Sequence, residues 1–81
     1  MEGYCGEIKL FPYYFSPRGW AMCTGQLLTI AQNQALYSLI GTKFGGNGTT
    51  NFMLPNLQGA EPVPGMAYYI CVDDSMYPIK S

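Results

Sequence analysis

The sequence predicts an α+β domain, with one helix over about residues 30–41 and several short strands joined by long loops rich in glycine and proline. Three observations support this class. A helix start signal at Thr29 precedes apolar residues at helical spacing. Residues 7–11 alternate polar and apolar side chains, as a half-buried strand does. Residues 66–72 are rich in the aromatic and β-branched side chains that strands favour.

The first half of the chain predicts two strands before the helix. Pro12 ends the first of them, at residues 7–11, because proline cannot donate to a strand ladder. Residues 20–23 form the second expected strand. The turn signal Thr-Gly at 24–25 then indicates a hairpin-like bend into residues 26–30.

Helix signals are the clearest local pattern in the sequence. Thr29 followed by Gln32 forms a capping box, and Gly41 stands where a helix needs a residue of positive φ to end. Four apolar side chains fall on one face of the expected helix: Ala35, Leu36, Leu39 and Ile40. This stripe is typical of a helix that packs on a sheet.

Two loops dominate the second half of the chain. Residues 42–51 are punctuated by glycines, and residues 55–65 hold three prolines and two glycines. Between these loops, residues 52–54 predict a very short strand that Pro55 ends. The last expected strand, at 66–72, is almost continuously apolar, which indicates burial on both faces.

Length and composition favour the association of one small domain with other copies. A single domain of 81 residues, spanning 1–81, buries only about 60–65% of its unfolded surface. Hydrophobic residues make up 48% of the chain and charged residues 11%, against about 25% charged in typical domains. Charges this sparse cannot cover a monomer's surface, and burial against other copies is the simplest remedy.

Charge and apolar run length exclude two classes of partner. A net charge of -1 offers no attraction for nucleic acid or anionic membranes. The longest apolar runs are far shorter than the ~20 residues that cross a bilayer, so we expect no membrane insertion. The first residues lack the basic region and apolar core of a classical signal peptide, so export would need another route.

Residue types for catalysis are scarce. The chain has no histidine, and its adjacent acids are Asp73 and Asp74. Side chains of neighbouring strand residues point apart, so a solvated turn is favoured here over a weak cation site. Three cysteines with no C-x-x-C spacing do not indicate a metal site. We therefore expect no catalytic residue, no metal and no cofactor.

Residues 45–48, Gly-Gly-Asn-Gly, invite comparison with phosphate-binding loops. They match neither the P-loop nor the dinucleotide-binding pattern, and they follow a helix where those loops follow a strand. Residues 47–49 also match the N-glycosylation acceptor pattern, but Asn-Gly is a common tight-turn dipeptide. The sequence therefore favours a turn.

Two long motifs carry a resemblance to a known family: PRGWAMCTGQLL at residues 17–28 and NQALYSLIGTKFGGNGTTNFMLPNLQG at residues 33–59. They fit the patterns P-x-G-W-x-x-C-x-G-Q, A-L-[FY]-x-L-[IL]-G-T-x-[FY]-G-G and F-x-L-P-[DN]-L-x-G. Residues 6–59 thereby resemble the phage tail collar domain, which is also found in microcystin-dependent proteins and in short tail fibres. Residues 66–81 resemble the terminal strand and tail of longer members.

The resemblance implies a small fold in which the capped helix packs on short, mostly antiparallel strands. It also implies a non-enzymatic structural subunit that forms a trimer or a repeating fibre, with itself or with other tail and fibre proteins. Its location would be a virion tail or an extracellular or cell-surface appendage. Longer members carry a histidine-containing segment where this chain has residues 60–65, so neither a histidine metal site nor a large receptor-binding insertion is implied here.

We expect the last strand to present an exposed apolar edge that associates with other copies. The expected oligomer interface combines this strand with the first one: Ile8, Leu10, Tyr68, Tyr69, Ile70 and Val72. Closed cyclic symmetry would give a trimer, whereas a head-to-tail contact that does not close would give a filament.

The glycine-rich segment is expected to return the chain from the helix to the core. Its glycines would adopt positive φ, and its apolar residues would hold it down by burial. The glycines are Gly41, Gly45, Gly46 and Gly48, and the apolar anchors are Phe44, Phe52 and Leu54. Trp20 is expected to anchor the core beneath the helix, whose apolar face covers the sheet.

Two further hypotheses concern aromatic and thiol side chains. As an alternative function, an exposed aromatic patch could bind a cell-surface glycan through Tyr13, Tyr14, Phe15 and Tyr77. Cys5 could form an intersubunit or tail-linking disulfide with Cys71 if the assembly is extracellular. The alternative for Cys5 is a partly exposed thiol.

Overall fold

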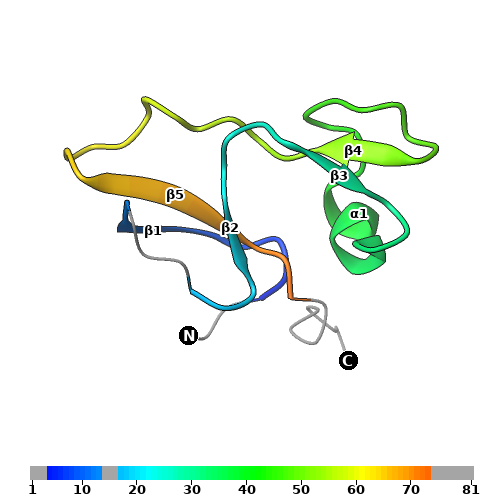
Figure 1. Ribbon diagram of the computed structural model, residues 1–81, viewed down its shortest axis with the longest axis horizontal. Helices are drawn as coiled ribbons and strands as arrows, with labels where there is room; N and C mark the ends of the chain where they lie inside the picture. Colours follow the sequence, from blue (N-terminus) through cyan, green and yellow to red (C-terminus); the bar gives the residue numbers. More distant parts are fainter. Residues whose placement is uncertain (1–3, 14–16, 74–81) are drawn as a thin grey trace.

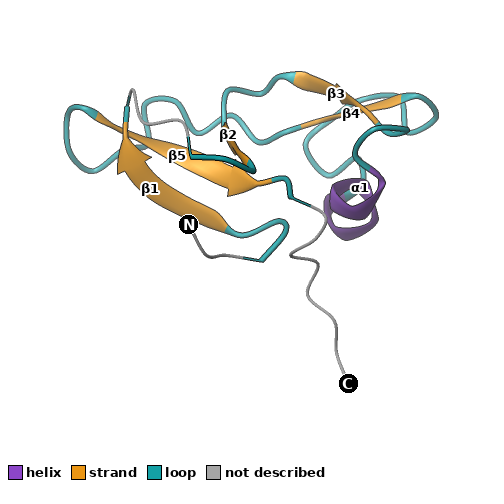
Figure 2. Ribbon diagram, turned by 60° about the horizontal axis from the view of Figure 1, so that its bottom comes forward, coloured by secondary structure: helices purple, strands orange, loops and turns teal. Residues whose placement is uncertain are grey.

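The computed structural model describes residues 4–13 and 17–73. One helix and five strands follow each other along them: β1 (Ile8–Pro12), β2 (Trp20–Met22), β3 (Leu27–Thr29), α1 (Gln34–Ile40), β4 (Asn51–Met53) and β5 (Met66–Cys71). The strands form a three-stranded sheet in the order β1-β5-β2 and a two-stranded sheet of β3 and β4. All pairings within the described residues are antiparallel, so the structure is α+β as expected. Figures 1 and 2 show α1 against the two-stranded sheet, with the larger sheet extending to the other side.

The central strand of the larger sheet is β5, which pairs on both sides. The expected exposed edge at 66–72 is therefore wrong, since β1 and β2 cover the two edges of β5. Composition does not reveal strand order, but it did predict burial on both faces correctly. Tyr69 and Ile70 point to opposite faces and are 3% and 1% exposed.

Two clusters of buried side chains lie on the two faces of this sheet. The first joins the sheet to α1 and the smaller sheet, and it contains Cys5, Cys23, Leu36, Phe52, Leu54 and Ile70. The second contains Trp20, Ala67, Tyr69 and Cys71. Trp20 therefore does not lie beneath the helix, contrary to expectation. It pairs with Cys71 and points to the second cluster, whereas its neighbour Ala21 pairs with Ile70 and points to the first.

The start of α1 differs from the one that the capping box predicts. The first helical residue is Gln34, and the N-cap is Asn33, which makes no side-chain cap hydrogen bond. Thr29 is instead the last residue of β3, and Ile30 continues the pairing by donating its N–H to the Thr50 carbonyl at 3.0 Å. The predicted capping box is wrong, because Thr29 pairs within the smaller sheet and its hydroxyl donates to the Gln32 Oε1 at 3.4 Å instead of accepting a helix N–H. Its carbonyl accepts the Asn33 Nδ2 at 2.9 Å.

The end of α1 is where the sequence predicts it. Gly41 has φ 55° and donates its N–H to the Tyr37 carbonyl at 2.8 Å. The apolar face packs unevenly, since Leu36 is 1% exposed and Leu39 is 39% exposed. Only part of the expected stripe therefore covers the core.

The Thr-Gly bend does not make a hairpin. β2 and β3 belong to different sheets, so the expected hairpin-like turn at 24–25 is wrong. The Gln26 side chain stabilises the connection from β2 to β3. Its Oε1 accepts a hydrogen bond from the Thr24 hydroxyl and its Nε2 donates one to the Met22 carbonyl, both at 2.8 Å. Thr24 also pairs with Asn56 in an isolated bridge, which joins this connection to the loop after β4.

A turn and a bulge precede β1. Glu7 donates its N–H to the Tyr4 carbonyl at 2.8 Å, which closes the turn. Gly6, with φ 89°, and Glu7 then lie opposite the single residue Cys71. The Gly6 N–H donates to the Cys71 carbonyl at 2.8 Å, and the Cys71 N–H donates to the Glu7 carbonyl at 2.9 Å. A bulge of this kind needs glycine at its first position, and here it turns Cys5 into the core.

Candidate assembly surface

The register of β1 and β5 brings part of the predicted interface onto one face of the sheet. Ile8 lies opposite Ile70 and Leu10 lies opposite Tyr68, and directly paired residues point to the same face. Ile8 is 40% exposed, and Leu10 and Tyr68 are half-buried, with Tyr68 packed in part against the first core cluster. We define these three side chains as the β1–β5 face. Ile70 is 1% exposed and belongs to the core rather than to this surface.

The other two predicted interface residues lie elsewhere. Tyr69 points to the opposite face, where it is buried and donates its hydroxyl to the Tyr13 carbonyl at 2.7 Å. Burial raises the pKa of the Tyr69 phenol, and nearby Tyr13 adds to the shift. Val72 lies past the end of β5 and packs against the first core cluster. The structure thus brings three of the six predicted residues together on a partly uncovered surface.

The edge strand beside this face, β1, is protected against pairing with another strand. The Lys9 Nζ lies 3.9 Å from the Glu7 Oε2 and 5.8 Å from the centre of the Trp20 ring. Pro12 ends the strand and has no N–H to donate. Charge and proline on an edge strand disfavour strand addition. Association through the β1–β5 face is therefore more compatible with this sheet than association through the β1 edge.

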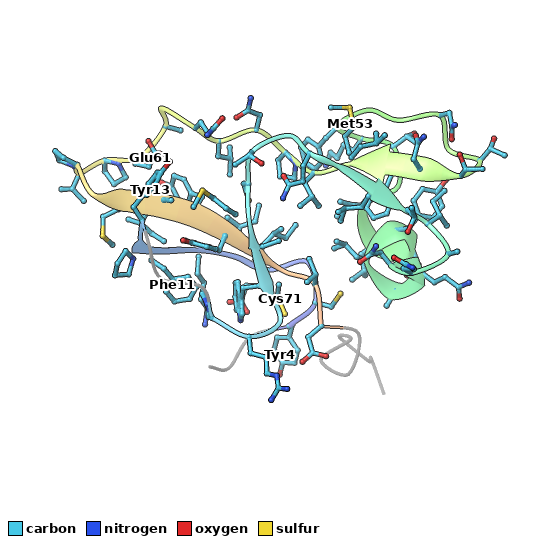
Figure 3. All side chains as sticks on the ribbon, viewed as in Figure 1. Tyr4, Phe11, Tyr13, Met53, Glu61 and Cys71 are labelled. Carbon is cyan, nitrogen blue, oxygen red and sulfur yellow. The ribbon has the colours of Figure 1, made fainter. Side chains whose placement is uncertain are left out.

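One residue of the expected aromatic patch lies within the described part of the chain. Tyr13 is 42% exposed and lies just past the end of β1 (Figure 3). Its carbonyl accepts the Tyr69 hydroxyl, which fixes its main chain against the sheet. Tyr14, Phe15 and Tyr77 lie outside the described residues, and glycan binding stays a prediction.

The glycine-rich loop has the expected backbone but only part of the expected anchoring. The four glycines that were expected to have positive φ do so: Gly41, Gly45, Gly46 and Gly48. A Cβ at Gly46 would lie 2.4 Å from the Phe52 Cα and 2.9 Å from the Asn51 carbonyl oxygen. Phe52 and Leu54 are buried at 0% and 1% exposure. Phe44 is 41% exposed, so the prediction that it pins the loop by burial is wrong.

Main-chain contacts with β4 and the side chain of Asn47 hold the loop instead. The Gly45 carbonyl accepts the Met53 N–H at 3.1 Å, and Met53 lies beside the loop (Figure 3). The Asn47 Oδ1 accepts three consecutive main-chain N–H groups, from Thr49, Thr50 and Asn51 at 2.8, 2.9 and 3.1 Å. Sequence reasoning missed this role of Asn47, since the Asn-Gly pair signals only a turn.

The segment that builds β1 to β4, α1 and the glycine-rich loop is also the segment that a family model recognises. The model of the Phage Tail Collar Domain matches residues 6–62. The chain belongs to the phage tail collar domain family. In this collar domain the match ends before β5, which pairs with β1 and β2 of the matched segment. No curated protein and no solved structure matches the chain significantly.

The collar domain is a structural family rather than an enzyme family, and it implies a place in the phage tail. Within residues 4–13 and 17–73, no helix is long and apolar enough to cross a membrane. The same ranges contain no group of three or more histidine, cysteine and acidic side chains that could hold a metal ion. A structural role follows from family membership, and the surfaces described above are candidates for contact with other tail components.

The three cysteines of this collar domain are buried thiols, and no disulfide joins them although all three lie among the described residues. Cys5 is 3% exposed in the first core cluster, and Cys71 is 1% exposed in the second. Neither sulfur is therefore at the surface, where the predicted intersubunit disulfide would need it. The alternative of a partly exposed Cys5 thiol is also wrong, because the turn and bulge before β1 direct this side chain inward.

We expect the stability of this collar domain to fall at high pH through titration of Cys23. Burial raises the pKa of its thiol from 9.0 to about 11. The folded state keeps a proton that the unfolded chain loses, so this stabilisation is complete below pH 9.0 and is lost as the pH rises toward about 11. Urea unfolding midpoints across this range should fall more steeply for the wild type than for Cys23→Ala. The pKa of Tyr69 is also raised, but Tyr69 is present in both proteins and contributes equally to both. Midpoints that fall in parallel with pH would therefore contradict the assignment of the effect to Cys23.

Proposed function

We propose that this collar domain is a structural subunit that assembles with copies of itself, as a trimer or a repeating fibre, in a phage tail or in a phage-tail-like or extracellular appendage. The observation that carries the proposal is the β1–β5 face, where Ile8 is 40% exposed beside the half-buried Leu10 and Tyr68. Removing apolar surface from water stabilises a contact by about 25 cal/mol of free energy for each Å² buried. Membership of a structural tail family supports the same conclusion.

The rest of the surface is consistent with association. Charged residues make up 11% of the chain, so few like charges oppose contact between copies. Large hydrophobic side chains that are exposed include Tyr4, Ile8, Tyr13, Leu27, Leu39, Phe44 and Val63. Single exposed hydrophobic residues are common on monomers. Ile8 differs from the other six because it lies beside Leu10 and Tyr68 on paired strands.

The geometry of the contact decides between the two assemblies. In a trimer or a fibre, each copy presents the β1–β5 face to a different surface of the next copy, because both use head-to-tail contacts. The ring closes if the rotation between neighbours returns to the first copy, and otherwise the contact repeats along a fibre. Like faces that meet across a two-fold axis would give a dimer instead.

Ile8→Lys is expected to weaken self-association about tenfold or more, because it places a charge within an apolar contact. The measurement is size-exclusion chromatography with light scattering over a range of concentrations, with negative-stain imaging to tell trimers from fibres. Val63→Lys is the matched control, since Val63 is 49% exposed in the loop before β5 and outside the β1–β5 face. We expect this control to assemble like the wild type.

Two results would contradict the proposal. One is a wild-type protein that stays a monodisperse monomer at every concentration. The other is an Ile8→Lys protein that is folded by circular dichroism and assembles like the wild type. A wild-type dimer would contradict the trimer and fibre geometries.

A further inference from the structure

Asn47 and Gly48 form an Asn-Gly pair in the loop between α1 and β4, where Asn47 is exposed. The second residue of such a pair has no side chain, so its main-chain nitrogen can approach the asparagine carboxamide. The other asparagines of the chain are each followed by a residue that carries a side chain. We propose that Asn47 is a deamidation site whose conversion is controlled by opening of the loop over residues 45–51. This modification is independent of the proposed structural role.

The reaction needs only water as a co-reactant. The Gly48 nitrogen loses its proton and attacks Cγ of Asn47, and the new N–C bond closes a succinimide ring. The Cγ–Nδ2 bond breaks, and the leaving nitrogen takes up a proton and departs as ammonia. Water then opens the ring at either carbonyl. One opening gives aspartate at position 47, and the other gives isoaspartate, whose main chain is one methylene longer.

The folded loop restrains both reacting groups. The Gly48 N–H donates to the Asn51 carbonyl at 3.0 Å. The Asn47 carboxamide is held at both ends, since its Oδ1 accepts three main-chain N–H groups and its Nδ2 lies 3.1 Å from the Thr50 hydroxyl. Attack requires the carboxamide to rotate and the Gly48 nitrogen to leave its acceptor. These hydrogen bonds must therefore break first, so the reaction proceeds from an open loop.

The two products differ in how they fit the closed loop. Aspartate presents a carboxylate oxygen to the same three N–H groups, and hydrogen bonds to a charged acceptor are the stronger kind. Isoaspartate inserts a methylene between the Cα of residue 47 and the Gly48 nitrogen, which shifts the Gly48 N–H from its place against the Asn51 carbonyl. We therefore expect aspartate to keep the loop on β4 and isoaspartate to detach it.

The test compares deamidation of the full chain in its folded and denatured states. The protein is incubated in mildly alkaline buffer with and without guanidinium chloride. Peptide mapping by mass spectrometry follows conversion at Asn47, and labelling by an isoaspartate methyltransferase separates the isomers. We expect conversion to be about tenfold or more slower in the folded state, because several hydrogen bonds must open. Equal rates in the two states would overturn the proposal.

Two threonine variants isolate the contribution of the loop bonds. Thr50→Val removes the hydroxyl beside the Asn47 Nδ2 and keeps the side-chain shape. We expect it to speed conversion in the folded state several-fold and to leave the denatured rate unchanged. Thr49→Val is the matched control, because the Thr49 hydroxyl makes no hydrogen bond within the described residues. A folded Thr50→Val protein that converts at the wild-type rate would also overturn control by the loop.

Discussion

Gly46→Ala is expected to lower the free energy of unfolding of the collar domain by roughly 3 kcal/mol or more. Gly46 has φ 100°, a conformation that side chains disfavour. The added Cβ would also lie 2.4 Å from the Phe52 Cα and 2.9 Å from the Asn51 carbonyl oxygen. Both are main-chain atoms of β4, which its pairing with β3 holds in place. The variant must therefore open the smaller sheet or displace the loop.

Gly59→Ala separates the collision from the backbone strain. Gly59 has φ 87°, but nothing lies within 4 Å of the place where its Cβ would be. This control therefore carries the strain alone and should cost about 1 kcal/mol. Urea unfolding of both variants, followed by far-UV circular dichroism, gives the comparison. Equal losses of stability would show that the close contact with β4 contributes nothing.

Phe52→Ala should cost about 3–5 kcal/mol of unfolding free energy, because it empties the centre of the first core cluster. Phe52 is 0% exposed and pairs with Leu28 across the smaller sheet. Its ring centre lies 5.3 Å from that of Tyr37, so truncation also removes an aromatic contact with α1. Native domains have only about 5–15 kcal/mol of stability in total, so this one change brings the protein close to unfolding.

Phe44→Ala is the matched control, since it makes the same substitution at a ring that is 41% exposed. We expect it to cost at most about 1 kcal/mol. Where Phe52→Ala is unfolded in dilute buffer, trimethylamine oxide stabilises the folded state and lets all three proteins be measured under the same conditions. Similar losses of unfolding free energy in Phe52→Ala and Phe44→Ala would contradict the conclusion that Phe52, and not Phe44, anchors the core.

Local sequence patterns predicted those elements that local chemistry decides. The strand at 66–72 follows from its side chains, and the positive φ at Gly41 follows from glycine itself. Thr29 shows where such patterns fail, because a threonine suits a helix cap and a strand equally well. Its pairing with Asn51 decided the outcome. Strand order depends in the same way on contacts between distant segments, so composition could not show that β5 is central.

The candidate surface was predictable in part for related reasons. Alternation placed Ile8 and Leu10 on one face, and the register with β5 adds Tyr68. Tyr69 and Ile70 are the same residue types as Tyr68 and Ile8, but they are buried. Their burial depends on what covers each face of β5. The role of Asn47 in holding the loop could not be predicted. Its Oδ1 accepts hydrogen bonds from three main-chain N–H groups, and these groups point toward it only in the folded loop.

The central position of β5 also bears on when this protein can associate. β5 follows both of its neighbours along the chain, and β1 and β2 are not paired with each other within the described residues. While the chain is being synthesised, neither strand can form its ladder until β5 has left the ribosome. The β1–β5 face does not exist before that moment. The proposed association through this face therefore requires β5 to be in place between β1 and β2 first.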